Sequence, residues 1–383
     1  ASATIRALSY GNSIYLAMYW PGDYATSTNA STWNVQGTKM QSQKIAAATY
    51  GASTFLIAGA SGKLSTSTDA ITWTARTSGF SNTINAAIYA GGKFVICGDT
   101  DGIATSSDAA TWSYYTGALS GDSGNALTYG NSVYVIAGGN GKLFTSATAL
   151  TGSWTSRTSG FGTTAINGLA YANVGGTNTF VAVGSGGKIS RSVDGSAVTW
   201  ALQTSPVATN LLAVAYGNGR FVAVGASGTF LYSSDGATWA QATDVTSAAN
   251  ANALMFTNGV FVAVCTSGIV ATSPDGITWS LATSDLTADS FWSVCASGTK
   301  FIAGSGSGYY STSAPGVPAL YLARTTPYFS SNANSAVSFS AGTKSAELIP
   351  AEISGSNGLV VRNSNGTTAR TIAGTANQVT VTN

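Results

Sequence analysis

The chain has 383 residues, a formal net charge of +2 and no histidine, and charged residues make up 8% of it, against about 25% in an average soluble domain. Because 44% of the residues are hydrophobic, the chain can bury a large core, which argues against intrinsic disorder. The lysines and arginines are scattered and no apolar run is long enough to span a bilayer, so we expect neither nucleic-acid binding nor membrane insertion.

Along the chain, a unit of about 40 residues recurs, a period typical of repeat folds. The clearest copy runs from Leu212 to Trp239 and parses as three short strands, each followed by a Gly- or Asn-containing turn, with a fourth strand starting at the tryptophan. Four short antiparallel strands per unit predict the blades of a β-propeller. The tryptophans that mark the repeat are Trp33, Trp73, Trp112, Trp154, Trp200, Trp239 and Trp279.

The second strand of each unit is apolar on both faces, as in FVICG at Phe94 and FVAVG at Phe221. A half-exposed strand would alternate apolar and polar residues. We therefore expect each sheet to be covered on both faces by neighbouring sheets, as in a propeller. Cys97, Cys265 and Cys295 lie in such apolar stretches and are predicted to be buried free thiols.

Counting the units gives the number of blades. The eighth unit has three recognisable strands and is followed by Pro315 and Pro318 where its tryptophan strand should be. We predict an all-β propeller of eight four-stranded blades over residues 1–315, the last one short or completed by the ALYLAR segment after Pro318. Seven blades with a leftover unit is the alternative. The units begin near Ile5, Ile45, Ile84, Asn125, Ile166, Leu211, Asn252 and Phe291.

The turn before each tryptophan resembles the Asp box, S/T-x-D-G-x-T-W, of sialidase-type propellers. It is fullest at Asp194, Asp235 and Asp275, and it is lost before Trp154. A carboxylate at such a hairpin accepts hydrogen bonds from backbone N–H groups of its own turn, and the tryptophan buries a large apolar area. We interpret as structural the residues Asp69, Asp108, Asp194, Asp235, Asp275, Trp73, Trp112, Trp200, Trp239 and Trp279.

The sialidase resemblance implies an arginine cluster, a tyrosine nucleophile assisted by a glutamate, and an aspartate acid/base. Both glutamates, Glu347 and Glu352, lie beyond the repeats. Histidine, the usual general acid/base, is absent from the sequence. We therefore predict no enzyme activity, no catalytic residues, no metal and no cofactor. A glycan-degrading enzyme with an aspartate pair, such as Asp99 and Asp101, stays open as an alternative, and the same GDTDG turn could hold calcium or be a solvated hairpin.

Residues 316–383 lack the repeat, and their apolar residues alternate weakly, which predicts a small β-rich stem that trimerises. The final stretch, NGTTARTIAGTANQVTVTN, is similar to segments of bacteriophage tail-fibre proteins. The resemblance implies an extracellular virion protein, a homotrimer that contacts other tail proteins and binds a polysaccharide or receptor on the host cell. A third interpretation is a cellular assembly factor resembling the photosystem II assembly propellers.

Binding residues are expected on one rim, in the loops between the second and third strands and between blades. Aromatic rings among uncharged polar residues suit sugars, and the two RTSGF loops carry both. The candidates are Trp20, Asp23, Arg76, Phe80, Asp99, Asp101, Tyr114, Tyr115, Arg157 and Phe161.

Overall fold

The structure is a computed structural model. It divides the chain into two units, Ala1–Phe329 and Ser330–Asn383. In the second unit β32 (Leu359–Val361) pairs antiparallel with β33 (Arg370–Ile372); the predicted boundary at 315/316 and the trimerising stem stay predictions. The structure describes residues 4–20, 23–36, 44–100, 102–116, 119, 121–150, 152–193, 200–243, 245, 247–283, 289–297, 300–306, 310–312, 359–361 and 370–372.

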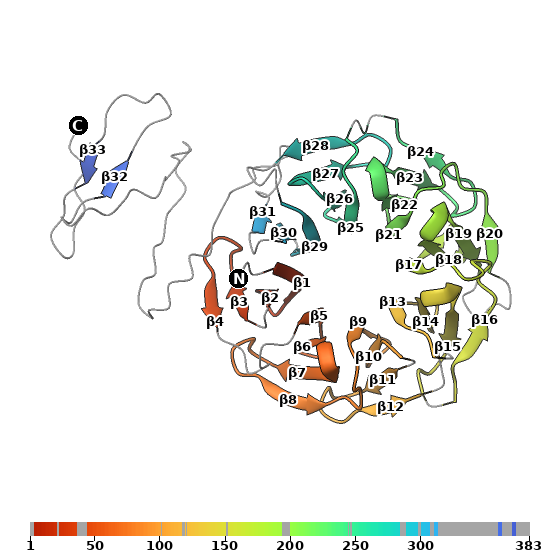
Figure 1. Cartoon of the computed structure of the whole chain (residues 1–383), viewed down its shortest axis with the longest axis horizontal. Coiled ribbons are helices and arrows are strands. Elements are labelled where there is room, and N and C mark those ends of the chain that lie inside the picture. Colours follow the sequence, from red (N-terminus) through yellow and green to blue (C-terminus); the bar gives the residue numbers. More distant parts are fainter. Residues whose placement is uncertain are drawn as a thin grey trace. The chain divides into compact units, whose positions relative to one another are not determined.

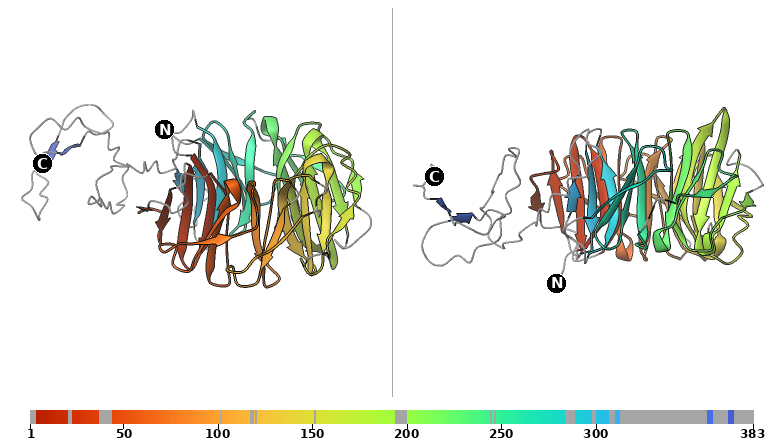
Figure 2. Two further views of the ribbon diagram at one scale, coloured as in Figure 1. Left: turned by 60° about the horizontal axis from the view of Figure 1, so that its bottom comes forward. Right: turned by 90° about the horizontal axis from the view of Figure 1, so that it is seen from above.

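The first unit is a β-propeller, in which antiparallel sheets follow one another around a common axis (Figure 1). Seven of the sheets have four strands. This is the number of complete blades in the alternative prediction of seven blades with a leftover unit. A three-stranded sheet, β29–β31, occupies an eighth position in the ring, where the sequence predicted a short last unit. Seen from the side, the sheets stand next to one another with their strands directed across the thickness of the ring (Figure 2).

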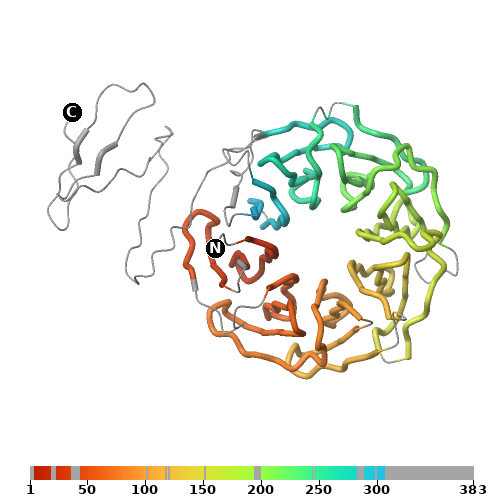
Figure 3. Tube along the Cα trace, in the orientation of Figure 1, coloured from red at the N-terminus to blue at the C-terminus, as the bar shows by residue number. Residues whose placement is uncertain are grey.

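The chain completes each sheet before it enters the next (Figure 3). The innermost, first strands are β1 (Thr4–Gly11), β5 (Ile45–Gly51), β9 (Ile84–Ala90), β13 (Gly124–Gly130), β17 (Ile166–Val174), β21 (Leu211–Gly217), β25 (Ala251–Thr257) and β29 (Phe291–Ala296). The second strands are β2 (Ile14–Trp20), β6 (Thr54–Gly59), β10 (Lys93–Gly98), β14 (Val133–Gly138), β18 (Thr177–Gly184), β22 (Arg220–Gly225), β26 (Val260–Cys265) and β30 (Phe301–Ser305).

Outside these lie the third strands, β3 (Tyr24–Ser27), β7 (Lys63–Ser67), β11 (Ile103–Ser106), β15 (Leu143–Ser146), β19 (Ile189–Ser192), β23 (Phe230–Ser233), β27 (Ile269–Ser273) and β31 (Tyr310–Thr312). The fourth strands start one residue after each repeat tryptophan: β4 (Asn34–Gln36), β8 (Thr74–Thr77), β12 (Ser113–Tyr115), β16 (Thr155–Arg157), β20 (Ala201–Gln203), β24 (Ala240–Gln241) and β28 (Ser280–Thr283). One-turn 3₁₀ segments join second to third strands at η1 (Ala60–Gly62), η2 (Gly139–Gly141), η3 (Ser185–Gly187) and η4 (Ala226–Gly228).

The second strands are buried on both faces, as their sequences predicted. In β10, the residues from Phe94 to Gly98 are all buried, and β14 is buried throughout. The clusters of core residues each combine side chains from two neighbouring blades, for example Leu56 of β6 with Phe94 of β10. Cys97, Cys265 and Cys295 are free and buried in this core. Stability therefore comes chiefly from apolar burial between blades.

A repeated contact fixes the spacing of adjacent blades. The last residue of several first strands is a glycine, and an aromatic residue near the end of the first strand in the next blade packs directly against it. A Cβ added to the glycine would overlap with that aromatic ring. Such a Cβ would lie 2.0 Å from Tyr50 Cγ at Gly11 and 2.0 Å from Tyr89 Cγ at Gly51, and the same holds at Gly130 and Gly217. Only glycine leaves room for this approach.

The ring closes where the three-stranded sheet meets the first blade. Strand β29 contacts β25 on one side and β1 on the other. The Thr4 hydroxyl donates to the Gly306 carbonyl at 2.6 Å, and Lys300 Nζ donates to the Asn29 carbonyl at 2.8 Å. The described part of the chain contains no helix with the length and hydropathy of a transmembrane span.

Candidate functional site

A β-bulge interrupts every innermost strand near its start, at the third residue of β1 and at the second residue of the other seven first strands. At β1, for example, Ile5 pairs with Tyr19 and Ala7 with Met18, so Arg6 has no partner in register. Bulges re-aim side chains and are common beside functional sites. We call the eight bulged residues the bulge ring: Arg6, Ala46, Asn85, Asn125, Asn167, Leu212, Asn252 and Trp292.

The bulge ring lies at the rim where the first strands begin, here called the linker rim. The same rim carries the connections between blades and the 3₁₀ segments. Backbone hydrogen bonds join them: Ala60 N donates to the Lys44 carbonyl at 2.8 Å, and Ala226 N to the Asn210 carbonyl at 2.8 Å. This confirms the expectation that both kinds of loop share one rim.

Three asparagines of the bulge ring connect neighbouring blades. Asn252 Nδ2 donates to the Phe291 carbonyl at 2.7 Å, and Asn167 Nδ2 donates to the Leu211 carbonyl at 2.8 Å. Asn85 bonds the Gly124 carbonyl in the same way, at 3.3 Å. An amide has two N–H groups and an acceptor oxygen, so one bond to the next blade leaves Asn167 and Asn252 further capacity for a ligand. Asn85 donates a second bond, to Asp99 Oδ1, which uses both of its N–H groups. Asn125, by contrast, is exposed.

Arg6 and Trp292 form the charged and aromatic part of the bulge ring. They belong to the two sheets that close the propeller, and Arg6 Cζ lies 4.5 Å from the centre of the Trp292 ring, within the range of a cation–π contact. Arg6 is exposed, and Trp292 keeps 39% of its surface accessible. The rim thus offers a planar cation and an aromatic ring beside neutral amides.

The Asp-box carboxylates are structural, as predicted, where the structure describes them. Asp275 Oδ1 accepts from the backbone N–H groups of Ile277 at 2.8 Å and Thr278 at 2.9 Å, and from the Ser273 hydroxyl at 3.0 Å. Asp69, Asp108 and Asp235 accept the equivalent three bonds. Asp194 lies outside the described residues.

These hydrogen bonds favour the ionised carboxylate. The N–H groups of Thr72 and Ile71 hold the pKa of Asp69 down to about 2, and equivalent bonds lower the pKa of Asp108 to about 2. Partial burial alone would raise the pKa of Asp235, but the hydrogen bonds outweigh it and the net shift is downward. A carboxylate held ionised in this way is a poor general acid.

The repeat tryptophans pack beside these turns. Trp73, Trp200, Trp239 and Trp279 are each less than a tenth exposed, and Trp112 is partly buried. The indole N–H of Trp239 donates to the Gly236 carbonyl at 3.0 Å, which ties the ring to its own Asp box. Their structural assignment agrees with this packing.

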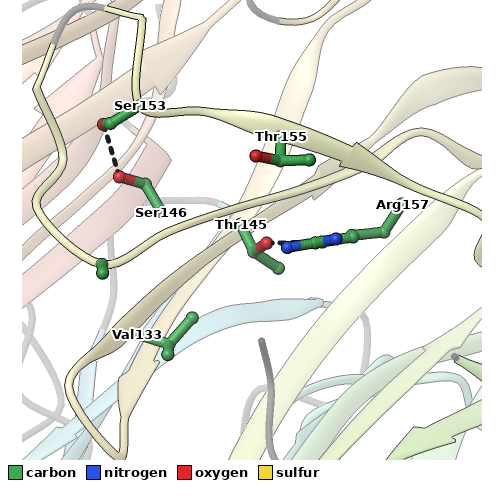
Figure 4. A pocket seen from close by; sticks show the side chains of 7 residues that line it. Val133, Thr145, Ser146, Ser153, Thr155 and Arg157 are labelled. Atoms are coloured by element: carbon green, nitrogen blue, oxygen red, sulfur yellow. Dashed lines mark hydrogen bonds between the residues drawn. The ribbon is translucent and has the colours of Figure 1, made fainter. Parts of the chain in front are cut away.

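A pocket lies where the Asp box is lost, in the blade of Trp154. Here Ser146 Oγ bonds Ser153 Oγ at 2.6 Å in place of a carboxylate. Val133, Thr145, Ser146, Ala147, Ser153, Thr155 and Arg157 line it (Figure 4). Arg157 lies along Thr145, to which its Nε donates at 2.8 Å. The pocket offers hydroxyls and one guanidinium, and its lining contains no carboxylate to act as a base.

The candidates in the RTSGF loops prove to be internal. Phe161 is fully buried and Phe80 is 8% exposed, because each loop crosses between two blades and its phenylalanine fills the space between them. Arg76 Nε donates to Thr66 Oγ1 at 2.9 Å, the counterpart of the Arg157 bond. The expectation that these phenylalanines present a sugar-binding surface is therefore wrong.

Two neighbouring candidates, Tyr114 and Tyr115, also make contacts within the propeller. Tyr115 is 8% exposed, and its hydroxyl bonds Thr105 Oγ1 at 3.2 Å, so a surface role for its ring is wrong as well. Tyr114 is half-buried, with its ring 4.9 Å from that of Phe80.

Among the candidates that the structure describes, Asp99 contacts the bulge ring, since one of its carboxylate oxygens accepts from Asn85 Nδ2 at 2.8 Å. Asp23 is exposed and directly precedes β3. Asp101 and the side chain of Trp20 lie outside the described residues. Among the described residues, no three acidic or cysteine side chains approach closely enough to hold a metal ion.

Sequence reasoning missed the bulge ring. The available signal was that asparagine recurs within the first two residues of four units, at Asn85, Asn125, Asn167 and Asn252, and that Trp292 stands second in the eighth unit. Trp292 lies in the FWSVCAS strand and does not follow an Asp-box turn. Its presence is therefore not explained by the packing role of the repeat tryptophans.

No known protein-family model matches the sequence, and comparison with curated proteins gave no match either. Solved structures match the fold. The computationally designed protein Ika8 is 14% identical and covers 82% of this chain and 96% of its own, with a TM-score of 0.64. Sqt1 of Chaetomium thermophilum is 11% identical and covers 80% and 94%, with a TM-score of 0.66. YCF48 bound to D1 peptide is 12% identical and covers 81% and 91%, with a TM-score of 0.52. The TM-scores and coverages show a shared fold, and at identities of 11–14% the likeness is one of fold alone.

Proposed function

We propose that the chain is a component of a virion tail fibre and that its propeller is a non-catalytic module that binds a glycan on the host cell. The observation that carries the binding role is the bulge ring, which gathers four asparagine amides, an arginine and an exposed tryptophan at one rim. The tail-fibre assignment is supported by the sequence of residues 365–383.

The chemistry of the rim suits an uncharged, hydroxyl-rich ligand. Amide groups both donate and accept hydrogen bonds, and sugar hydroxyls do the same. Binding sites of this kind combine apolar or aromatic surface with a few fixed polar groups. Three of the four bulge asparagines are fixed by their bonds to the next blade, so these three lose little side-chain entropy when a ligand binds.

Binding of the labelled full chain to host cells tests this proposal, with cells pretreated either with periodate, which cleaves vicinal diols of sugars, or with protease. We expect periodate to abolish binding and protease to leave it. The opposite result would contradict a glycan receptor. Location in the virion is tested separately, by labelling intact particles with antibody against the propeller.

A glycan-degrading enzyme is distinguished by its products. Incubating the chain with host polysaccharide and measuring released oligosaccharide gives the readout, and Asp99→Asn is the first variant to compare. If the unaltered chain releases oligosaccharide and Asp99→Asn does not, the chain is a glycan-degrading enzyme and the proposal of a non-catalytic binding module is refuted.

The second candidate is a cellular assembly factor that binds an extended polypeptide. It is favoured by one observation, the shared fold with YCF48, whose structure holds a D1 peptide. Amides and an exposed indole serve a peptide backbone as well as a sugar. A peptide array and a glycan array probed with the same labelled chain separate the two: retention on peptides alone would favour the assembly factor.

A further inference from the structure

Trp292 differs from every other described aromatic residue of the propeller. The large exposed hydrophobic side chains of the described residues are Val35, Ile71, Leu150, Val193, Leu202 and Trp292, and Trp292 is the one aromatic among them. Exposing an indole to water is unfavourable, and the repeat tryptophans avoid it by packing between blades. An exposed tryptophan at a rim is therefore a candidate for ligand contact.

Both neighbouring blades hold Trp292 in place. On one side, Asn252 bonds the carbonyl of Phe291, the residue that precedes Trp292, at 2.7 Å. On the other side, the guanidinium of Arg6 lies over the indole, 4.5 Å from its centre. The bond from Thr4 to Gly306 at 2.6 Å fixes the adjoining turn to β1. The indole is thus positioned before any ligand arrives.

We infer that Trp292 and Arg6 form a subsite for one pyranose ring of a surface polysaccharide. The exposed part of the indole supplies an apolar surface for the C–H groups of the sugar, and the guanidinium supplies fixed N–H donors for its hydroxyls. Asn252, the adjacent member of the bulge ring, supplies an amide. This inference rests on the proposed glycan-binding function and adds the place and the ligand class.

The charges near this subsite favour a neutral or weakly acidic sugar. Asp289 lies three residues before Trp292, on the connection that leads into β29, and one of its carboxylate oxygens accepts from Ser290 N at 2.8 Å. The negative charge of Asp289 therefore enters the subsite's blade with Trp292, and the positive charge of Arg6 comes from β1. The two charges together make a strongly anionic or cationic ligand a poorer fit than an uncharged sugar.

The experiment compares the binding of full-length variants to an array of bacterial surface polysaccharides. We expect Trp292→Ala to weaken binding about tenfold or more, a loss equivalent to about 1.4 kcal/mol, and Trp292→Phe to retain part of it, because a smaller aromatic surface remains. Ile71→Ala is the matched control, since Ile71 is 61% exposed in an Asp-box turn and its loss should leave binding unchanged.

Two outcomes would overturn the inference. The first is wild-type binding by Trp292→Ala while the unaltered chain binds glycans, in which case the proposed function stands and the subsite is wrong. The second is an equal loss in Trp292→Ala and Ile71→Ala. If the unaltered chain binds peptides and no glycan, the proposed function itself fails.

A second readout separates ligand contact from a purely structural role in closing the ring. Hydroxyl-radical footprinting, followed by mass spectrometry, measures oxidation at each tryptophan with and without the polysaccharide retained on the array. We expect protection at Trp292, with the buried repeat tryptophans unchanged. A ring-closing role alone would lower the melting temperature of Trp292→Ala and give no ligand-dependent protection, and that result would also refute the subsite.

Discussion

Replacing Gly51 by alanine tests the contact that sets the spacing between blades. The new Cβ would lie 2.0 Å from Cγ of Tyr89, about half the usual carbon–carbon distance. The φ angle of Gly51 lies outside the left-handed region, so backbone strain does not contribute. Tyr89 cannot move away freely, because its ring packs on Phe94 with their centres 4.7 Å apart. The substitution must therefore push two blades apart or distort the tyrosine.

Overpacking of this kind costs about 1–3 kcal/mol. The entropy of unfolding is about 2.1 cal/mol/K per residue, so a propeller of roughly 310 residues loses about 1.5 °C of melting temperature per kcal/mol. We expect the melting temperature of Gly51→Ala to fall by about 2–5 °C in scanning calorimetry.

Gly139→Ala is the matched control. Its Cβ would meet nothing closer than 3.9 Å, and alanine already stands at the same position in two other blades, as Ala60 and Ala226. We expect no loss of stability there. In the double variant Gly51→Ala with Tyr89→Ala, the cost should be smaller than the sum of the single costs, because residues in contact are not additive. An unchanged melting temperature in Gly51→Ala would refute the steric argument.

Three further predictions concern the Asp boxes and the thiols. Gly276→Ala should destabilise the protein by about 1–2 kcal/mol or more, because φ is +75° and the new Cβ would lie 2.5 Å from a methyl group of Val222 in the preceding blade; a denaturant midpoint equal to that of the unaltered chain would contradict this. The folded pKa of Asp69, about 2, lies below its unfolded value of about 3.9, so its carboxylate stabilises the fold above about pH 4 and this contribution disappears as the pH falls towards 2. In Asp69→Asn, which copies the natural Asn29 box, the melting temperature should fall less steeply over that range, and equal slopes would count against the hydrogen-bond account. Burial raises the pKa of Cys265 and Cys295 to about 12, so the native protein should not react with a thiol reagent at pH 8 until it is unfolded, and rapid reaction would show that these thiols are accessible.

The blades could be predicted because their signals are local. The spacing of turns and the two-sided apolar character of strands such as β22 follow from residues adjacent in sequence, and so does the role of Asp235 and Asp275, whose partners lie within three residues. The fourth strands were placed within one residue.

The site could not be predicted because it depends on which blades are neighbours. Phe161 reads as a loop residue, yet the blades on either side of its loop bury it completely. The contact of Arg6 with Trp292 joins residues at opposite ends of the propeller sequence, and it exists only because the ring closes. A bulge also depends on the register in which two strands pair, so the recurring asparagines do not by themselves indicate that these residues are bulged.

The contact between a glycine and the next blade's aromatic ring has a consequence for how the protein is made. Gly11 is covered by Tyr50, and Gly51 by Tyr89, so each partner is translated about 40 residues after the glycine it covers. A growing chain can therefore bury each blade soon after the following one leaves the ribosome, without waiting for the complete polypeptide. The exception is the junction of β1 with β29, whose two sides are synthesised first and last. The first blade must keep that apolar face open to water until translation of the propeller is finished, which makes this junction the stage at which aggregation competes with folding.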